Sequence, residues 1–463
     1  MRRFFIPLLA SLALGACASM APTFERPASP VPVQLPAGGA TSTTPAADIP
    51  WQTFVLDARL REVITLALAN SRDLRKTLAS VESARAQYRI QDAARLPTIT
   101  ANAGATTQRA LTTGTSTARS TNASATVGTS AWEIDLFGRA RSLSDAQLES
   151  WLATAEGARA ARLTLIGETA TAWLTLAADR SALALSRQTL DAAQHSMELT
   201  TRRLEGGVAS RVDVRLAETV FQQARADVAS NTTAISQARN ALELLVGHTV
   251  GDDLLPEGLP SETEVVQDVP AGLSSTVLLQ RPDVLQAEHQ LKSANADIGA
   301  ARAAYFPTLS LTANGGVAST ALSTLLSGGA TIWSLAPALS MTLFDGGARD
   351  ANLAYAKSQR EMYVANYELT VQTAFKEVAD ALARRATMDE QVAAQMALVE
   401  AAADSYRLAN ARYAKGVDTF LVALDGQRTL YSAQQALLMV RLEAVRNRAV
   451  VYQVLGGGGG FPG

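Results

Sequence analysis

The sequence predicts a mixed α and β membrane protein, a tandem duplication in which long coiled-coil helices alternate with pairs of β-strands. Three observations support this prediction. Helical periodicity continues over two stretches of about 67 residues, 139–205 and 349–415, so each predicted helix would be roughly 100 Å long. Between the helical stretches, apolar and polar residues alternate as they do in strands. The same order of segments occurs twice along the chain.

Composition and charge narrow the functional classes. The chain has 463 residues, 48% of them hydrophobic but only 5% aromatic, and a formal net charge of -2. This balance gives no electrostatic case for binding nucleic acid. A single cysteine allows neither a disulfide framework nor a cysteine metal cluster. The histidines lack metal-ligand spacing, and no nucleophile elbow, Walker loop or dinucleotide fingerprint is present. The sequence therefore predicts no enzyme, no metal site and no cofactor.

The N-terminus resembles that of a bacterial lipoprotein. Arg2-Arg3 precedes an apolar run over residues 4–14, which is too short to span a bilayer permanently. Leu14-Gly15-Ala16-Cys17 resembles a lipobox, which implies removal of the signal peptide 1–16 and acylation of Cys17. Ala18 follows in place of the Asp that tends to retain lipoproteins at the inner membrane, which favours the outer membrane. The alternative is a simple signal peptide with small residues near its cleavage site.

The rest of the chain divides into a tail and two repeats. Residues 17–56 are expected to be a lipid-anchored, proline-rich tail. Repeat 1 is predicted over 57–247, with helices near 57–70 and 72–94, a strand pair over about 98–137, a long helix over 139–205 and a helix over 208–247. An equatorial connector follows over 248–280. Repeat 2 is predicted over 281–457, with a helix over 281–303, a strand pair over about 307–344, a long helix over 349–415 and a helix over 417–455. Residues 458–463 are expected to be a flexible tail.

Matching landmarks establish the offset between the repeats. Each landmark pair ends a helix, ends a strand or marks a bend, and its two members are separated by about 207 to 210 residues. The pairs are Pro97 and Pro307, Phe137 and Phe344, Val208 and Val417, and Gly247 and Gly456.

The predicted strands have one apolar face. This face is expected to meet lipid, and the alternative is burial against another soluble sheet. The residues assigned to it are Trp132, Leu309, Leu311, Leu339, Met341 and Leu343. Single-chain barrels start at about eight strands, so four strands cannot close one. An open edge in lipid leaves backbone groups unpaired, at several kcal/mol each. If the strands enter the membrane, several chains must share one barrel.

Six motifs, in order on the duplicated frame, resemble those of TolC-like outer-membrane efflux proteins, in the lipoprotein branch that includes OprM and the NodT-type proteins. Each motif is weak alone, but the resemblance as a whole covers essentially all of residues 17–457. The motifs are Leu14-Gly15-Ala16-Cys17, Trp132-Glu133-Ile134-Asp135-Leu136-Phe137-Gly138-Arg139, Gln280-Arg281-Pro282-Asp283-Val284, Ala304-Tyr305-Phe306-Pro307, Leu343-Phe344-Asp345-Gly346-Gly347 and Arg412-Tyr413-Ala414-Lys415-Gly416-Val417-Asp418. Of these, Arg281, Pro282 and Asp283 are expected to be structural.

The resemblance implies a homotrimer with a shared 12-stranded outer-membrane β-barrel and a periplasmic α-barrel built from the long helices. It implies the passive exit duct of a tripartite efflux pump, which docks to a periplasmic adaptor (membrane fusion) protein and an inner-membrane transporter of the proton-driven RND type. The expected location is the outer membrane of a Gram-negative bacterium, with a lipid anchor at the periplasmic face and contact with outer-membrane lipid. The exported substrate stays open among drugs, metal cations and other small molecules.

A second, non-enzyme class is a periplasmic coiled-coil adaptor or scaffold lipoprotein without a pore. An adaptor would have one helical hairpin and an inserted β-domain. This chain is predicted to have two hairpins and a strand pair in each repeat, which favours the channel.

By the same resemblance, the bend between the last two helices would be the periplasmic gate. Leu421 and Asp425 would point at the channel axis as constriction rings, and Asp418 would be a further contributor. Tyr413 and Gly416 match the usual residues of such a bend. The alternative for Asp425 is an ordinary solvated helix residue.

The corresponding bend of repeat 1 is not equivalent. It lies at residues 205–208, and the positions that match Leu421 and Asp425 hold Val212 and Leu216. The second hairpin is therefore expected to move when the tunnel opens, and the first to be a static wall.

Overall fold

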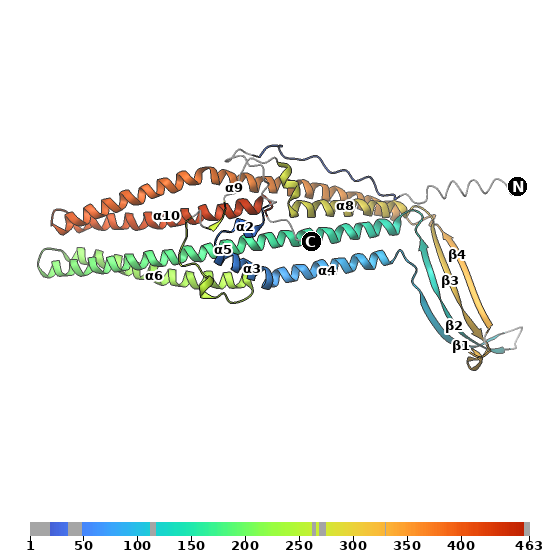
Figure 1. Cartoon of the computed structure of the whole chain (residues 1–463). Helices are drawn as coiled ribbons and strands as arrows, with labels where there is room; N and C mark the ends of the chain where they lie inside the picture. Colours follow the sequence, from blue (N-terminus) through green and yellow to red (C-terminus); the bar gives the residue numbers. More distant parts are fainter. Residues whose placement is uncertain are drawn as a thin grey trace. The chain divides into compact units, whose positions relative to one another are not determined.

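The computed structural model describes residues 19–35, 49–111, 117–261, 265–267, 275–328 and 330–457, and it combines long helices with strands (Figure 1). Within these residues, no helix has the length and apolar character needed to cross a membrane. The elements in chain order are α2 (Trp51–Phe54), α3 (Ala58–Asn70), α4 (Arg72–Ala93), β1 (Thr100–Leu111), β2 (Thr117–Ile134), α5 (Arg139–Glu205), α6 (Arg211–Val246), η2 (Asp252–Leu254), η3 (Ser275–Gln280), α8 (Pro282–Ala303), β3 (Thr308–Ser319), η4 (Leu322–Thr324), β4 (Ala330–Ser340), α9 (Ala348–Ala414) and α10 (Phe420–Val454).

The chain forms two compact units, and each draws segments from both halves of the sequence. Unit 1 contains Met1–Ala28, Ser80–Ala155 and Gln286–Glu368. Unit 2 contains Ser29–Ala79, Glu156–Leu285 and Leu369–Gly463. All four strands belong to unit 1, and both helical bends belong to unit 2. The two repeats therefore do not fold as two separate globular domains.

Unit 1 contains a four-stranded antiparallel sheet with the strand order β1-β2-β3-β4 (Figure 1). The central pairing of β2 with β3 joins the strand pair of the first repeat to that of the second. Pro337 lies in β4, an outer strand, where the missing N–H of proline is tolerated. Among the described residues, β1 and β4 each pair on one side only. The sheet therefore has two open edges.

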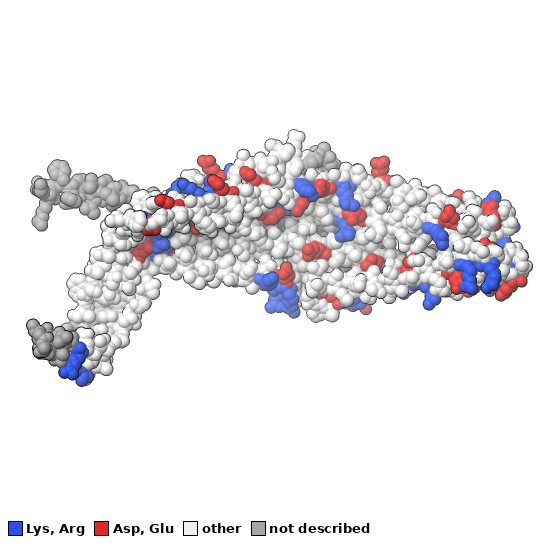
Figure 2. Space-filling model, turned by 180° about the vertical axis from the view of Figure 1, so that it is seen from behind, with Lys and Arg blue, Asp and Glu red and all other residues white. Residues whose placement is uncertain are grey.

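The sheet carries very few charges. Neither β3 nor β4 contains a charged residue, and β2 contains only Arg119 and Glu133. Figure 2 shows the strand region as an almost uncharged surface with basic side chains at one end, whereas both signs of charge are scattered over the helices. Such a surface suits contact with an apolar environment better than contact with water.

The last strand is shorter than the sequence predicts. The alternation of apolar residues predicts a strand pair that ends near residue 344, but β4 ends at Ser340. Met341 and Leu343 lie in the irregular segment between β4 and α9. Gly346 and Gly347 in this segment have φ values of 67° and 90°. A backbone in the left-handed region turns the chain toward α9 and cannot continue a strand.

In unit 1, the N-terminal segment lies against α8. Asn295 donates a hydrogen bond from Nδ2 to the carbonyl oxygen of Pro22 at 2.7 Å, and Arg302 donates one from Nη1 to that of Met20 at 3.2 Å. A Cβ on Gly299 would lie 2.7 Å from a backbone nitrogen of the segment, so only glycine allows this approach. The order of these contacts shows that the segment runs antiparallel to α8. Its start is near the end of α8 that leads into β3.

In unit 2, residues 51–54, which the sequence analysis places in the tail, form the short helix α2. Trp51 and Phe54 are buried, and the Phe54 ring stacks on that of Tyr452 in α10 with 3.9 Å between centroids. Val55 then forms an isolated antiparallel bridge with Val266 of the connector. The aromatic contact attaches α2 to the end of α10, and the backbone bridge attaches the residue after α2 to the connector.

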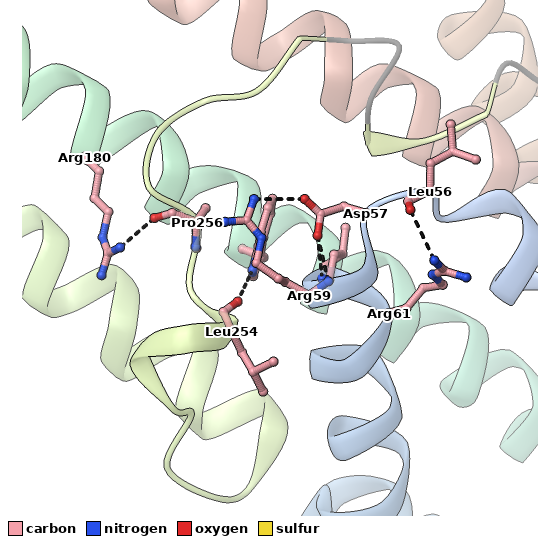
Figure 3. A network of polar contacts seen from close by, with 9 residues as sticks. Leu56, Asp57, Arg59, Arg61, Arg180, Leu254 and Pro256 are labelled. Carbon is pink, nitrogen blue, oxygen red and sulfur yellow. Dashed lines mark hydrogen bonds and ion pairs between the residues drawn. The ribbon is translucent and has the colours of Figure 1, made fainter.

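The connector is also bound to α5 by a network of polar contacts (Figure 3). Trp173 donates from Nε1 to the carbonyl oxygen of Leu254 at 3.0 Å, and Arg180 donates from Nη1 to that of Pro256 at 2.6 Å. Asp57 caps α3 by accepting from the backbone nitrogen of Arg59 at 2.8 Å. The network gives the irregular connector a defined position beside two helices.

Arg281 joins three segments of unit 2 at one point. Its side chain is only 10% exposed. Nη1 donates to the carbonyl oxygen of Val454 at 2.6 Å, at the end of α10, while Nη2 contacts Asp283 and Glu377, each at 2.7 Å. A cation at the C-terminal end of a helix is favoured by the helix dipole. The structural role expected for Arg281 and Asp283 agrees with this geometry.

Replacing Arg281 with Ala should lower the free energy of unfolding by about 2 kcal/mol, because hydrogen bonds between charged groups are lost in a mostly buried site. A lower midpoint of urea denaturation would show this loss. Lys376→Ala is the matched control, since its ion pair with Asp380 is largely exposed and should leave the midpoint almost unchanged. Equal midpoints for the two variants would contradict the role given to Arg281.

Candidate functional site

The second bend, between α9 and α10, is closed by glycine. The backbone nitrogen of Val417 donates to the carbonyl oxygen of Arg412 at 3.0 Å, and that of Gly416 donates to the oxygen of Tyr413 at 2.9 Å. This pair of hydrogen bonds is a Schellman motif. It requires a left-handed residue at its end, and Gly416 has a φ of 76°. Glycine at this position therefore sets the point at which α9 ends.

Asp418 is held within its own bend by an ion pair with Arg412. The distances are 2.9 Å from Nη2 to Oδ1 and 2.5 Å from Nε to Oδ2. This hydrogen bonding from the guanidinium lowers the pKa of the Asp418 carboxyl below its usual value. The carboxylate is therefore ionised at neutral pH and is paired with Arg412, two residues before the end of α9.

Tyr413 connects the second bend to the first hairpin. Its side chain is buried, and the guanidinium of Arg203 lies 4.4 Å from the centre of its ring. Arg203 also donates from Nη1 to the carbonyl oxygen of Tyr413 at 2.8 Å. The ring packs in a cluster that includes Phe420 and Leu424 of α10 and Ala217 of α6. We call these five residues, Arg203, Ala217, Tyr413, Phe420 and Leu424, the tip cluster.

The first turns of α10 separate into a packed face and a free face. Phe420, Ala423 and Leu424 are buried in the tip cluster or beside it. Leu421, with 58% of its surface exposed, and Asp425, also exposed, lie four residues apart and so share the opposite face. In the single chain, these two candidate gate residues are therefore free to face another surface.

The first bend, between α5 and α6, repeats the same cap with different surroundings. Val208 and Gly207 donate to the carbonyl oxygens of Arg203 and Leu204, at 2.8 and 2.9 Å. Here Ser210 and Asp213 form a reciprocal capping box at the start of α6. Among the described residues, the side chain of Thr419, the N-cap residue of α10, makes no such capping hydrogen bond. The two bends thus share the same backbone turn but differ in how the start of the following helix is capped.

The positions that correspond to the candidate gate residues also differ between the bends. Val212, which matches Leu421, is 65% exposed. Leu216, which matches Asp425, is half-buried and packs against the tip cluster. The first hairpin therefore presents no acidic side chain at the position of Asp425.

Sequence reasoning missed Arg203. The repeat contained a signal for it, because Arg203 occupies the position that Arg412 occupies in the second bend. Asp418, the acid bound by Arg412, is matched in the first bend by Ala209. Arg203 thus has no acid at the position that matches Asp418, and it contacts Tyr413 of the other hairpin.

The apolar strand residues are aligned across the sheet. Trp132 is paired with Leu311, and Leu309 with Leu339, so their side chains point to the same side. Leu339 is 70% exposed, while Leu309 and Leu311 are half-buried. Met341 and Leu343 are also exposed but lie beyond the end of β4. Trp132 additionally donates from Nε1 to the carbonyl oxygen of Arg95 at 3.2 Å.

Two further predictions concern lipidation and metal binding. Cys17, the expected lipidation site, lies outside the described residues. In the part of the chain that the structure describes, no group of three or more His, Cys, Asp or Glu side chains could hold a metal ion.

Comparison with known proteins identifies the family. The model of the outer membrane efflux protein family matches residues 63–248 and 273–457. The chain is 42% identical over 453 residues to the probable efflux pump outer membrane protein TtgC of Pseudomonas putida, covering 96% of this chain and 93% of that protein. It is 41% identical over 455 residues to the outer membrane protein OprJ of Pseudomonas aeruginosa, covering 97% and 95%.

Solved structures agree with these sequence relationships. A membrane protein from Pseudomonas aeruginosa has a TM-score of 0.90 and 40% identity, covering 95% of this chain and 100% of that one. The open state of the MtrE outer membrane channel of Neisseria gonorrhoeae has a TM-score of 0.86 and 36% identity, covering 95% and 98%. As its motifs predict, the chain belongs to the outer membrane efflux protein family.

Proposed function

We propose that the protein is the outer-membrane channel of a tripartite efflux pump and passively conducts substrates from an inner-membrane transporter and a periplasmic adaptor to the outside. The observation that carries this proposal is a four-stranded sheet with two open edges and few charges, in a chain that also forms two long helical hairpins. The relatives named as efflux pump outer membrane proteins support it. They also favour the channel over a periplasmic adaptor or scaffold without a pore.

The working form is a homotrimer. In the hydrocarbon of a membrane, each unpaired backbone group costs several kcal/mol, so β1 and β4 need partners. Three copies joined edge to edge give a closed 12-stranded barrel, a size within the known range of outer-membrane barrels. Trp132, Leu309, Leu311 and Leu339 would then meet outer-membrane lipid, with Met341 and Leu343 at the margin of the barrel.

The partners are a periplasmic adaptor and an inner-membrane transporter, for which we propose the RND type. The transporter supplies the energy, so the channel itself requires no cofactor. Relatives are named for efflux of antibiotics and of toluene. We therefore propose small organic molecules as the cargo. The test is loss of resistance to such compounds when the gene is deleted, and recovery when the full chain is restored.

Acylation of Cys17 would attach the protein to the outer membrane. Cys17→Ser should abolish labelling with radioactive palmitate and remove the acyl mass from the mature chain, because no other cysteine is present. Mass spectrometry of the purified protein measures this directly. Finding no acyl mass on the wild-type chain would mean that the N-terminus is a simple signal peptide.

The second bend is proposed as the periplasmic gate, with Leu421 and Asp425 forming rings around the axis of the trimer. Asp418 is expected to act indirectly, by fixing the bend through Arg412. Tyr413 and Gly416 would position the hairpin. A ring of carboxylates at Asp425 favours cations at the entrance.

Leu421→Ser and Asp425→Ala should each raise single-channel conductance in planar bilayers by at least about twofold, because a constriction is widened, and Asp425→Ala should also reduce cation selectivity. Val212→Ser is the matched control, since it makes a similar exposed change at the equivalent position of the first hairpin. Conductance that stays at the wild-type value in both gate variants would remove these residues from the gate.

A further inference from the structure

A second polar connection joins the two hairpins away from their bends. The Tyr431 hydroxyl of α10 donates to Oδ2 of Asp227 on α6 at 3.0 Å. Beside it, Asn231 of α6 donates from Nδ2 to Oγ of Ser186 on α5 at 2.6 Å. Burial, together with the hydrogen bond to Asp227, raises the pKa of Tyr431 to about 12, so the hydroxyl keeps its proton at neutral pH. We call Ser186, Asp227, Asn231 and Tyr431 the bolt.

The bolt lies well away from the tip cluster. Phe420 in the tip cluster and Tyr431 in the bolt are about three helical turns apart on α10, or roughly 16 Å. The second hairpin is therefore attached to the first at two separate levels. Beyond the bolt, Gln395 of α9 donates from Nε2 to the carbonyl oxygen of Ala433 at 3.1 Å, which holds α9 and α10 together there.

Between the two attachments the helices border a hollow of about 440 Å³ that is open to solvent. Its walls include Val220 and Ala224 of α6 and Gln427 of α10, and the bolt residues Asp227 and Tyr431 border it. Gln427 is only 8% exposed, and its Nε2 has no hydrogen-bond partner among the described residues. The walls mix apolar and polar side chains, and the polar groups of Gln427, Asp227 and Tyr431 suit water, which can leave when the walls approach each other. The hollow is therefore room into which a helix can shift, unlike a close-packed interior.

We propose that the bolt is the pivot of the gate. The part of the second hairpin between its bend and Tyr431 moves about this point, and the hollow takes up the displacement. The part of α10 beyond Tyr431 stays fixed. Tyr431 is thus a positioning residue, which acts on Leu421 and Asp425 through the helix that carries all three. This inference rests on the proposed role of the second hairpin as the gate.

Hydrogen exchange of the full chain in detergent tests the pivot directly. Arg203→Ala loosens the tip cluster and should speed amide exchange in α10 before residue 431 but not after it. When Tyr431→Phe is added, amide exchange beyond residue 431 should also become faster, by about tenfold or more relative to Arg203→Ala alone. This is the factor expected for a lost hydrogen bond to a carboxylate. If the boundary stays at residue 431 in the double variant, the bolt is not the pivot.

Tyr452→Phe is the matched control in the Arg203→Ala background. It also removes a tyrosine hydroxyl from α10, but at a different place in unit 2. The Tyr452 hydroxyl donates to the carbonyl oxygen of Ile49 at 2.7 Å. Tyr452→Phe should leave both the exchange boundary and the single-channel conductance unchanged. Tyr431→Phe should raise the conductance of the Arg203→Ala channel by at least about twofold, because a freed hairpin widens the constriction. Equal conductance in the two double variants would overturn the proposal.

Ala224→Leu tests the hollow. The larger side chain fills part of the space and should reduce the conductance gained by Arg203→Ala, and an undiminished gain would show that the hollow takes no part. These results distinguish a failure of the proposed channel function from a failure of the proposed pivot. If the wild-type protein carries no current, the proposed channel function is wrong. If Leu421→Ser raises conductance but Tyr431→Phe acts like Tyr452→Phe, only the pivot is wrong.

Discussion

The pairing of backbone hydrogen-bond groups at the edges of the sheet is the constraint on which the rest of the structure depends. Each half of the chain supplies one strand pair, and the pairing of β2 with β3 joins them into one sheet. Two separate strand pairs would have four unpaired edges, and the pairing of β2 with β3 removes two of them. The remaining edges belong to β1 and β4, and an apolar environment allows neither to stay unpaired. The proposed homotrimer, in which identical copies supply the missing partners, rests on these two unpaired edges and on no particular side-chain contact.

The two halves differ in the side chains at their bends. Both bends keep the Schellman cap and a left-handed glycine, because the backbone turn is needed in each hairpin. In the first bend, Asp213 completes a capping box and fixes the start of α6. In the second, Val422 stands at the matching position, and Asp418 instead pairs with Arg412. One ancestral turn thus yields a firmly capped hairpin and another that is held mainly by its neighbour.

Local features of the structure could be read from the sequence, and distant contacts could not. The helix α5 has the bounds predicted for it, residues 139–205, because a 3.6-residue periodicity and a terminal glycine are local signals. The predicted end of the last strand, near residue 344, was wrong, because the alternation of apolar and polar residues continues into the irregular segment after Ser340.

Within the candidate site, Gly416, Leu421 and Asp425 were named through the resemblance to the family, and the structure places Leu421 and Asp425 on an exposed face of α10. The contact of Arg203 with Tyr413 joins residues 210 positions apart. The repeat distinguishes Arg203 from Arg412, because Ala209 stands at the position of Asp418, but no local pattern shows that the partner of Arg203 is Tyr413.

The antiparallel course of the N-terminal segment along α8 has a consequence for the order of events during biogenesis. Pro22 is bound by Asn295, which lies 273 residues later in the chain. Because contacts of such long sequence separation form late, the segment has no docking site until the second half of the protein has been made and α8 has folded. During that interval the segment makes none of its contacts with α8. The close approach of the segment at Gly299 is therefore a late step in folding, which follows the synthesis of the second half of the chain.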